Sequence, residues 1–314
     1  MSLPFFSAED VLSSVSMKNA IEAMEDAFIS LSDGAAIIPN RINISIPDKK
    51  AFHLSMPAYI TGGKYITVKL VNIHLNNPPL DLPLINGVIV VMDADRGDTL
   101  ALIEGKSVTA LRTGAASGLA TKLLSKPDAT TAVIFGSGVQ AEYQIKAIQE
   151  VRDLESIKVL ARNKQRLIDF CDQFDSVVQP GERSDLKEAD IVCTATTSTV
   201  PLFGNNDVSQ GVHINAVGAH GPDSREISAD IIHSADVFVD HLPPSKEEAG
   251  NILIPINDGS YSWEQIKGEL GSILSSGERN FNSHKKNTVF NSIGNAVQDL
   301  VIAAKVMESN YNAK

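Results

Sequence analysis

With 314 residues, 43% of them hydrophobic, the chain is long enough to bury two ordinary domain cores and is predicted to be globular. Its 27 Lys and Arg residues against 38 Asp and Glu residues give a net charge of −11, which repels phosphate backbones and anionic membranes and argues against both as partners. The two cysteines, Cys171 and Cys193, form no C-x-x-C pair, the histidines are scattered and the N-terminus lacks a signal-peptide pattern, so we expect no disulfide framework, no metal site and a cytoplasmic protein.

The first part of the chain is typical of two short helices followed by a sheet. From Ser7 to Leu31 apolar residues recur at helical spacings, and Asp33-Gly34 is a stop signal. Between Arg41 and Asp95, β-branched runs alternate with Pro, Gly and Asn clusters, which predicts a mixed or antiparallel sheet. A long helix rich in Ala, Leu and Thr is predicted over about 107–124, ending at Lys126-Pro127. We interpret this helix as the bridge between two domains.

From Ala129 onward the pattern alternates between buried strands and helices. Nearly continuous apolar runs predict strands in TTAVIF, SIKVLAR, ADIVCTAT, VHINAVGA and ADVFVDH. Helices are predicted over VQAEYQIKAIQEV and from Asn163 to Phe174. This alternation indicates an α/β domain with a Rossmann-type, doubly wound parallel sheet.

The C-terminal segment is predicted to return to the first domain. After Asn287, the stretch VFNSIGNAVQDLVIAAKV places five apolar residues on one helical face: Ile293, Val297, Leu300, Val301 and Ala304. We therefore expect a dinucleotide-binding domain at 115–290 and a smaller α+β domain made from 1–114 and 291–314.

A glycine-rich turn directly after the first strand of the Rossmann-type domain predicts a phosphate cradle. In AVIFGSGVQA, Gly136 permits a tight turn, Gly138 lets the backbone approach a pyrophosphate, and Ala141 allows close packing of helix on strand. The N-terminus of the following helix then faces the phosphates with unpaired N–H groups. The alternative is a glycine-rich turn without a ligand. The residues expected to contact the cofactor around this turn and at neighbouring strand ends are Thr113, Gly136, Ser137, Gly138, Val139, Gln140, Thr194, Ala195, Thr196, Val217 and Gly218.

The end of the second strand bears on which nicotinamide cofactor is used. An acid at this position holds the ribose 2′-hydroxyl of NAD, but here Ala161, Arg162 and Asn163 stand in its place. Because arginine pairs with a 2′-phosphate, the sequence favours NADPH. The alternative is that Arg162 is a solvated surface residue and that NADH is the cofactor.

The stretch GKSVTALRTGAASGLATKLL, together with AVIFGSGVQA, resembles the ornithine cyclodeaminase and μ-crystallin family. The similarity extends from IIPNRINI to the C-terminal TVFNSIGNAVQDL and so covers most of the chain. The resemblance implies a homodimer in which both chain ends build the domain for substrate binding and dimerisation.

The resemblance also implies that three cations bind a substrate carboxylate: Arg41 in PNR, Lys69 in TVKLVN and Arg112 in TALRT. Arginine binds a carboxylate through paired hydrogen bonds, and lysine supplies a compact, mobile charge. Salt bridges or helix-surface contacts are the alternative for the two arginines, and a snorkelling edge residue is the alternative for Lys69. Met56, His220 and Asn291 are expected to line the substrate pocket.

His220 lies in the turn VGAHGPDSREI, where the similar turn of the cyclodeaminases carries an Asp that is thought to receive the side-chain amine of the substrate. Imidazole cannot hold a cationic amine as a carboxylate does, so ornithine cyclisation is disfavoured. The turn looks closer to that of the ketimine reductases. His220 is either a pocket residue that takes part in proton transfer or a hydrogen-bonded wall residue.

These features predict an NAD(P)H-dependent reductase of a cyclic imino acid, Δ1-pyrroline-2-carboxylate or Δ1-piperideine-2-carboxylate, which forms L-proline or L-pipecolate. We expect Arg112 to orient the substrate and Lys69 to donate the proton, with His220 as the second choice. The alternatives are an alanine or N-alkyl amino acid dehydrogenase, an ornithine cyclodeaminase, and a non-catalytic NADP-binding protein like μ-crystallin.

Overall fold

The computed structural model describes residues 3–311 apart from 81, 220 and 277–285, and it divides into two compact units. Unit 1 comprises Met1–Arg112 and Asn295–Lys314, and unit 2 comprises Thr113–Gly294. The sequence placed the junctions at 114/115 and 290/291. The second junction lies later because the last strand before it, β15 (Thr288–Asn291), belongs to the sheet of unit 2.

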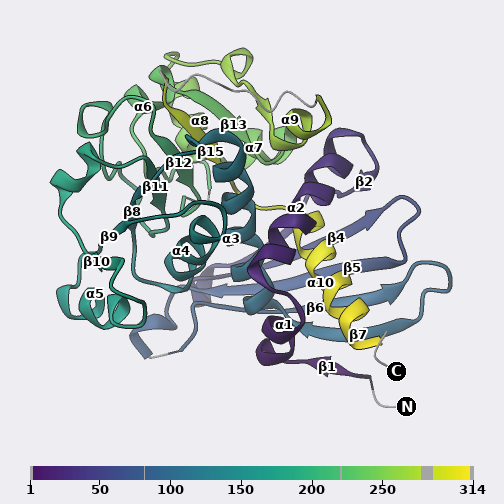
Figure 1. Cartoon of the computed structure of the whole chain (residues 1–314). Coiled ribbons are helices and arrows are strands. Elements are labelled where there is room, and N and C mark those ends of the chain that lie inside the picture. Colours follow the sequence, from purple (N-terminus) through teal and green to yellow (C-terminus); the bar gives the residue numbers. More distant parts are fainter. Residues whose placement is uncertain (1–2, 81, 220, 277–285, 312–314) are drawn as a thin grey trace. The chain divides into compact units, whose positions relative to one another are not determined.

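Unit 1 is built on a seven-stranded sheet with the order β1-β7-β6-β5-β4-β2, in which β3 also pairs with β4. The pairing is antiparallel except between β1 and β7. Helices α2 and α10 lie over one face of this sheet (Figure 1). The elements are β1 (Phe5–Phe6), α1 (Ala8–Ser14), α2 (Met17–Ser32), β2 (Ala36–Ile37), β3 (Ile42–Ile46), β4 (Ala51–Ile60), β5 (Tyr65–His74), β6 (Ile85–Asp93), β7 (Thr99–Glu104) and α10 (Ala296–Tyr311).

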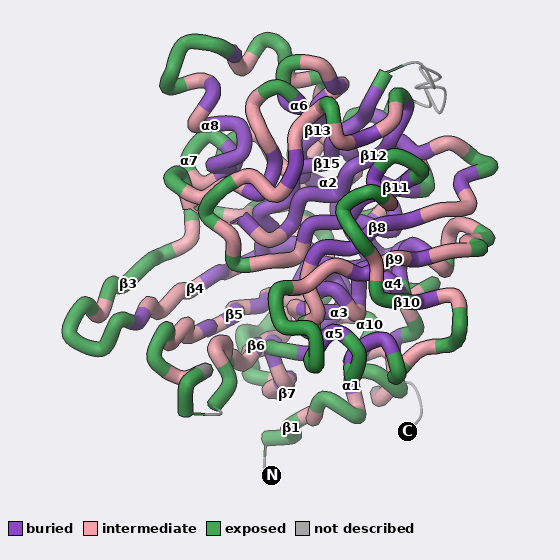
Figure 2. The backbone as a smooth tube through the Cα atoms, turned by 90° about the vertical axis from the view of Figure 1, so that its left-hand side faces the viewer, coloured by how far each residue is buried: buried purple, intermediate pink, exposed green. Residues whose placement is uncertain are grey.

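The two faces of this sheet differ in burial. Along β5 and β6, fully buried residues alternate with half-buried ones, as expected for strands whose side chains point to opposite faces in turn (Figure 2). The face toward α10 is buried. The opposite face is half-buried and still apolar, and strand register places its residues side by side: Tyr59, Ile66, Val68, Leu70, Val88, Val90, Met92 and Leu102.

Helix α3 (Gly105–Leu124) runs from unit 1 into unit 2, as predicted for the bridging helix. Unit 2 then forms an eight-stranded, entirely parallel sheet with the order β10-β9-β8-β11-β12-β15-β13-β14. The predicted α/β fold class is confirmed. The elements are β8 (Thr131–Phe135), α4 (Val139–Val151), β9 (Ser156–Leu160), α5 (Lys164–Cys171), β10 (Val178–Pro180), β11 (Ile191–Thr194), β12 (His213–Ala216), α6 (Ala229–Ser234), β13 (Asp236–Val239), α7 (Leu242–Glu248), α8 (Gly250–Asn257), β14 (Gly268–Glu269), α9 (Leu270–Ser276) and β15.

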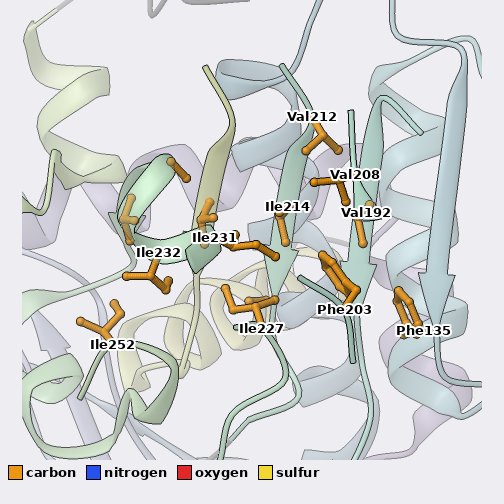
Figure 3. Close-up of a cluster of buried hydrophobic side chains, with 14 of the residues drawn as sticks. Phe135, Val192, Phe203, Val208, Val212, Ile214, Ile227, Ile231, Ile232 and Ile252 are labelled. Atoms are coloured by element: carbon orange, nitrogen blue, oxygen red, sulfur yellow. The ribbon is translucent and has the colours of Figure 1, made fainter. Parts of the chain in front are cut away.

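The strands of unit 2 are buried on both faces, which explains their nearly continuous apolar sequences. On one side, aliphatic residues of α6 and α8 pack on β11, β12 and β13, and the rings of Phe135 and Phe203 stack with centroids 5.3 Å apart (Figure 3). This packing fixes the strand ends from which the loops of the candidate site emerge.

The prediction for the C-terminal segment was wrong in its first part. Its residues Val289 and Phe290 lie in β15, in the middle of the parallel sheet, and the helix begins only at Ala296. A short apolar run fits a buried strand and a buried helix equally well, and here the strand forms because it pairs with β12 and β13 on both sides. Among the described residues, no helix is both long and apolar enough to cross a membrane.

A buried histidine ties α3 to the sheet inside unit 2. The ring nitrogens of His213 contact the hydroxyl of Thr288 at 2.9 Å and the amide oxygen of Asn215 at 3.2 Å. Asn215 in turn donates to Thr121 on α3 at 2.9 Å. Burial lowers the pKa of His213 to about 3, so the ring is neutral at physiological pH and serves as a structural link.

Candidate functional site

The glycine turn after β8 has the backbone that the phosphate cradle requires. Gly136 has a φ of 115°, a conformation that L side chains rarely adopt, and a Cβ placed there would lie 2.5 Å from the carbonyl oxygen of Ala195. Gly138 is the N-cap of α4, and no atom lies within 4 Å of the Cβ position at this residue. Ser137 lies between the two glycines, and Val139 and Gln140 open the helix. The backbone of the turn is therefore open at the Cβ position of Gly138, the residue that precedes α4.

The turn lies at the point where the strand order of the parallel sheet reverses. From β8 the chain moves outward to β9 and β10, then crosses back to β11 on the other side of β8. Ligands of open α/β sheets bind outside the carboxyl ends of the strands at such a point. Thr194 ends β11 at this edge, and Ala195 and Thr196 follow it; the amide N–H of Ala195 donates to the carbonyl of Phe135 at the end of β8.

A buried glutamate holds the loops that follow β11 and β12. Glu226 is 0% exposed, and its carboxylate accepts hydrogen bonds from the hydroxyl of Thr194 (2.8 Å), from the amide (2.7 Å) and hydroxyl (2.6 Å) of Thr196, and from the amide of Gly218 (2.8 Å). Burial raises the pKa of this carboxyl, and the four donors oppose the shift. Val217 is bonded through its amide to Thr194, so the whole edge forms one connected network.

The remaining predicted cofactor residues also lie in unit 2. Ala161, Arg162 and Asn163 follow β9, the neighbour of β8. Arg162 is exposed, and the side chain of Asn163 caps α5 by accepting from the amide of Arg166 at 3.0 Å. Thr113 is buried in α3, at the first position of unit 2.

Unit 1 contains a second candidate site, centred on Lys69. This lysine lies on β5 between β4 and β6, is 3% exposed, and places its Nζ 2.6 Å from Oδ2 of Asp299 on α10. The snorkelling interpretation is therefore wrong. Burial lowers the pKa of Lys69 to about 8; Asp299 opposes this shift, whereas the charges of Arg112 and Arg41 add to it. Such an ammonium is mostly protonated at neutral pH and is a competent proton donor.

Arg112 joins Lys69 on the same carboxylate. Its Nε lies 3.4 Å from Oδ1 of Asp299, and its Nη1 donates to Oε1 of Gln298 at 3.2 Å. The same Oε1 accepts from the backbone of Asn295 at 3.1 Å, whereas Nε2 of Gln298 has no hydrogen-bond partner in the described part of the chain. The arginine thus takes part in a buried ion pair, and an unsatisfied donor lies beside it.

Two further predicted residues lie near this cluster. Met56 on β4 is the register partner of Lys69, so both side chains emerge on the buried face of the sheet, and Met56 is 5% exposed. Arg41 directly precedes β3, is half-buried, and acts on Lys69 through its charge. The three basic side chains Arg41, Lys69 and Arg112 therefore belong to one electrostatic cluster around Asp299.

Asn291 belongs to unit 2, whereas the three cations belong to unit 1. This residue ends β15 in unit 2, is 1% exposed, and its Oδ1 accepts a hydrogen bond from Nδ2 of Asn251 at 2.8 Å. Asn251 also accepts from the backbone amide of Glu226 at 2.8 Å. Asn291 therefore supports the network at the carboxyl edge of the sheet. His220 lies outside the described residues.

Sequence reasoning missed Asp299, Gln298 and Glu226. The signal for Asp299 was a lone acid inside the apolar stretch VQDLVIAAKV, because an acid inside a helix that is buried on most sides requires a partner. Glu226 carried no comparable signal, since it follows the charged residues Asp223 and Arg225 in a turn.

Comparisons with known proteins identify the family. The model of the ornithine cyclodeaminase/mu-crystallin family matches residues 4–314. The chain belongs to this family. It is 32% identical to the Δ(1)-pyrroline-2-carboxylate reductase of Bacillus cereus over 309 residues, which cover 96% of this chain and 95% of the relative. The family predicted from the sequence motifs is thereby confirmed.

Two solved structures resemble the whole chain. The Δ(1)-pyrroline-2-carboxylate reductase of Thermococcus litoralis, solved in complex with NADH and L-proline, superposes with a TM-score of 0.94 at 32% identity and covers 99% of this chain and 98% of that one. An archaeal alanine dehydrogenase dimer with bound NAD superposes with a TM-score of 0.93 at 28% identity and covers 100% of this chain and 97% of that one. Both likenesses extend over the two units.

Proposed function

We propose that this protein reduces a cyclic imino acid, Δ1-pyrroline-2-carboxylate or Δ1-piperideine-2-carboxylate, to L-proline or L-pipecolate with a nicotinamide cofactor. The observation that carries the proposal is the pair of buried cations Lys69 and Arg112 on the carboxylate of Asp299, with the half-buried Arg41 close enough for its charge to act on Lys69. Such a set of basic side chains suits a substrate carboxylate. Reductases of Δ(1)-pyrroline-2-carboxylate among the relatives support this substrate class.

The glycine turn fits a dinucleotide. The open space at the Cβ position of Gly138 would let a pyrophosphate approach the backbone, and the first N–H groups of α4 would donate to it. Ser137, Val139 and Gln140 would border the phosphates, and the loops held by Glu226 would border the rest of the cofactor. When bound, the reduced nicotinamide supplies the hydride. The NADH and NAD named for the two similar structures support this cofactor class.

The side chains of unit 1 account for the rest of the reaction. Arg112 and Arg41 bind the substrate carboxylate and fix the plane of the ring, which is mainly an effect of orientation. Met56 covers the apolar part of the ring. As the imine carbon gains hydride, its nitrogen gains electron density, and Lys69 donates a proton to that nitrogen. The unpaired Nε2 of Gln298 is a further donor for a carboxylate oxygen.

A panel of substrates tests this function. The enzyme is mixed with NADH or NADPH and offered pyrroline-2-carboxylate, piperideine-2-carboxylate, pyruvate with ammonia, or pyruvate with methylamine, and absorbance at the nicotinamide band is followed. We expect the cyclic imines to have the highest kcat/KM. Faster turnover of pyruvate with an amine would instead establish an alanine or N-alkyl amino acid dehydrogenase, the alternative that the archaeal neighbour favours. Release of ammonia from ornithine without net change in the cofactor would establish a cyclodeaminase. Cofactor binding without turnover of any of these substrates would establish a non-catalytic protein.

For the cofactor, we propose a preference for NADPH based on Arg162. This exposed arginine stands where an acid would bind a ribose 2′-hydroxyl, and a charged hydrogen bond to a 2′-phosphate contributes about 1.5–3 kcal/mol. Arg162→Ala is therefore expected to raise the KM for NADPH about tenfold or more while leaving the KM for NADH within about twofold. Steady-state kinetics with both cofactors check this, with Arg183→Ala, an exposed arginine paired with Asp207, as the matched control. Equal effects on both cofactors would contradict the assignment.

We propose further that two copies associate through the half-buried apolar face of the unit 1 sheet. Its aliphatic residues, such as Val68 and Val90, have no described helix of unit 1 over them, and the similar alanine dehydrogenase is a dimer. Val68→Glu is expected to shift the mass in sedimentation equilibrium from dimer to monomer. Val200→Glu, at a valine 64% exposed on unit 2, is expected to remain dimeric. A dimeric Val68→Glu variant would overturn this interface.

A further inference from the structure

The acid between Lys69 and Arg112 takes no part in the binding and proton-transfer steps of the proposed reaction. Asp299 belongs to the first turns of α10, is 1% exposed, and has one carboxylate oxygen directed to each cation, 2.6 Å from Lys69 and 3.4 Å from Arg112. A carboxylate buried this deeply is costly unless it is paired, so its place between two cations is strongly determined.

We propose that Asp299 is a positioning residue of the reductase: it fixes the Nζ of Lys69 and the guanidinium of Arg112 relative to one another and keeps Lys69 protonated for transfer to the substrate nitrogen. The inference rests on the proposed function, and it assigns Asp299 no contact with the substrate. Gln298 assists, because its Oε1 holds a second nitrogen of Arg112.

The charges around Lys69 explain why the acid is needed. The charged groups that act on Lys69 in the described chain are Asp299 from α10, Arg112 from α3 and Arg41 before β3. Burial and both arginines favour the neutral amine, and Asp299 is the group that favours the ammonium. Without this carboxylate, Lys69 would lose its proton at a lower pH and its Nζ would lose its fixed partner.

Three variants test the inference. Asp299→Asn keeps the shape of the side chain and removes its charge, Asp299→Glu keeps the charge and displaces it, and Glu308→Gln is the control, because Glu308 is an acid of the same helix paired at the surface with Lys305. For each variant, kcat/KM for pyrroline-2-carboxylate with the preferred cofactor is measured from pH 6 to 10. Thermal unfolding and cofactor affinity are measured alongside.

Asp299→Asn is expected to lower kcat/KM at pH 8 by at least about tenfold. In the pH profile of kcat/KM, the alkaline limb is expected to shift to lower pH by about one pH unit or more. Asp299→Glu is expected to retain the wild-type limb with a reduced kcat, and Glu308→Gln to match the wild type. The inference would be overturned if Asp299→Asn had its alkaline limb at the same pH as the wild type and a kcat/KM within twofold of the wild-type value. If that variant does not fold, unaltered kcat in Asp299→Glu would overturn it equally.

The same experiment separates this inference from the proposed function. A wild-type protein that reduces no cyclic imine refutes the function. An active wild type whose pH profile is indifferent to Asp299→Asn refutes only the positioning role.

Discussion

Arg112→Ala is expected to lower kcat/KM for the cyclic imine by at least about a hundredfold, because a substrate carboxylate without its planar partner no longer holds the imine carbon in a reactive orientation. The arginine is 7% exposed and bound to Asp299 and Gln298, so its position is fixed before substrate arrives. Arg112→Lys is expected to retain a small part of the activity, since lysine keeps the charge and loses the paired hydrogen bonds.

Cofactor binding distinguishes loss of the substrate site from loss of the fold. Fluorescence titration with NADPH is expected to give nearly the same affinity for Arg112→Ala as for the wild type, since the glycine turn lies in unit 2. Arg96→Ala is the control, because Arg96 is paired with Asp93 and Asp98 on the surface and its side chain is 75% exposed. Unchanged turnover of the imine by Arg112→Ala would show that Arg112 does not bind the substrate carboxylate.

The second large effect is expected at Gly138. Its backbone is extended, with φ −112° and ψ −177°, and its Cβ position is open, so Gly138→Ala is expected to change the free energy of unfolding by less than about 1 kcal/mol. The added methyl group would nevertheless occupy the space of the pyrophosphate. Affinity for the dinucleotide is therefore expected to fall at least about tenfold, the loss of one charged hydrogen bond.

Gly136→Ala provides the contrast. Its positive φ and the 2.5 Å approach to the carbonyl of Ala195 make any side chain costly for the protein itself, so this variant is expected to lose both stability and cofactor binding. Thermal unfolding and cofactor titration measure the two quantities on the same samples. A Gly138→Ala variant that is stable and binds the cofactor normally would show that the turn does not hold a pyrophosphate.

Much of the fold was predictable because local patterns and tertiary structure agree. The apolar run before Gly136 was predicted as a strand and forms β8, and the segment after the turn was predicted as a helix and forms α4. The predicted Ala-rich helix is found at Gly105–Leu124. The strand at Thr288–Asn291 was not predictable, because its identity depends on pairing with β12 and β13, which are distant in sequence.

The candidate site was predictable only in part. The residue types of Arg41, Lys69 and Arg112 indicated binding of an anion, but nothing local to Lys69 showed that it would be buried and paired. That pairing depends on Asp299, which reaches the sheet only because α10 packs on β4 and β5. Asn291 was expected to line the substrate pocket, and its hydrogen bond to Asn251, which accepts from the amide of Glu226, could not be predicted because these residues are distant in sequence.

The proposed reaction is the transfer of a hydride from the nicotinamide to the imine carbon of a cyclic acid. Its most direct test is incubation of pyrroline-2-carboxylate with cofactor deuterated at C4 on the transferable face, followed by mass and NMR analysis of the product. L-proline with one deuterium at C2 is expected for each cofactor oxidised. Proline without the label, or no proline from an enzyme that binds both ligands, would contradict it.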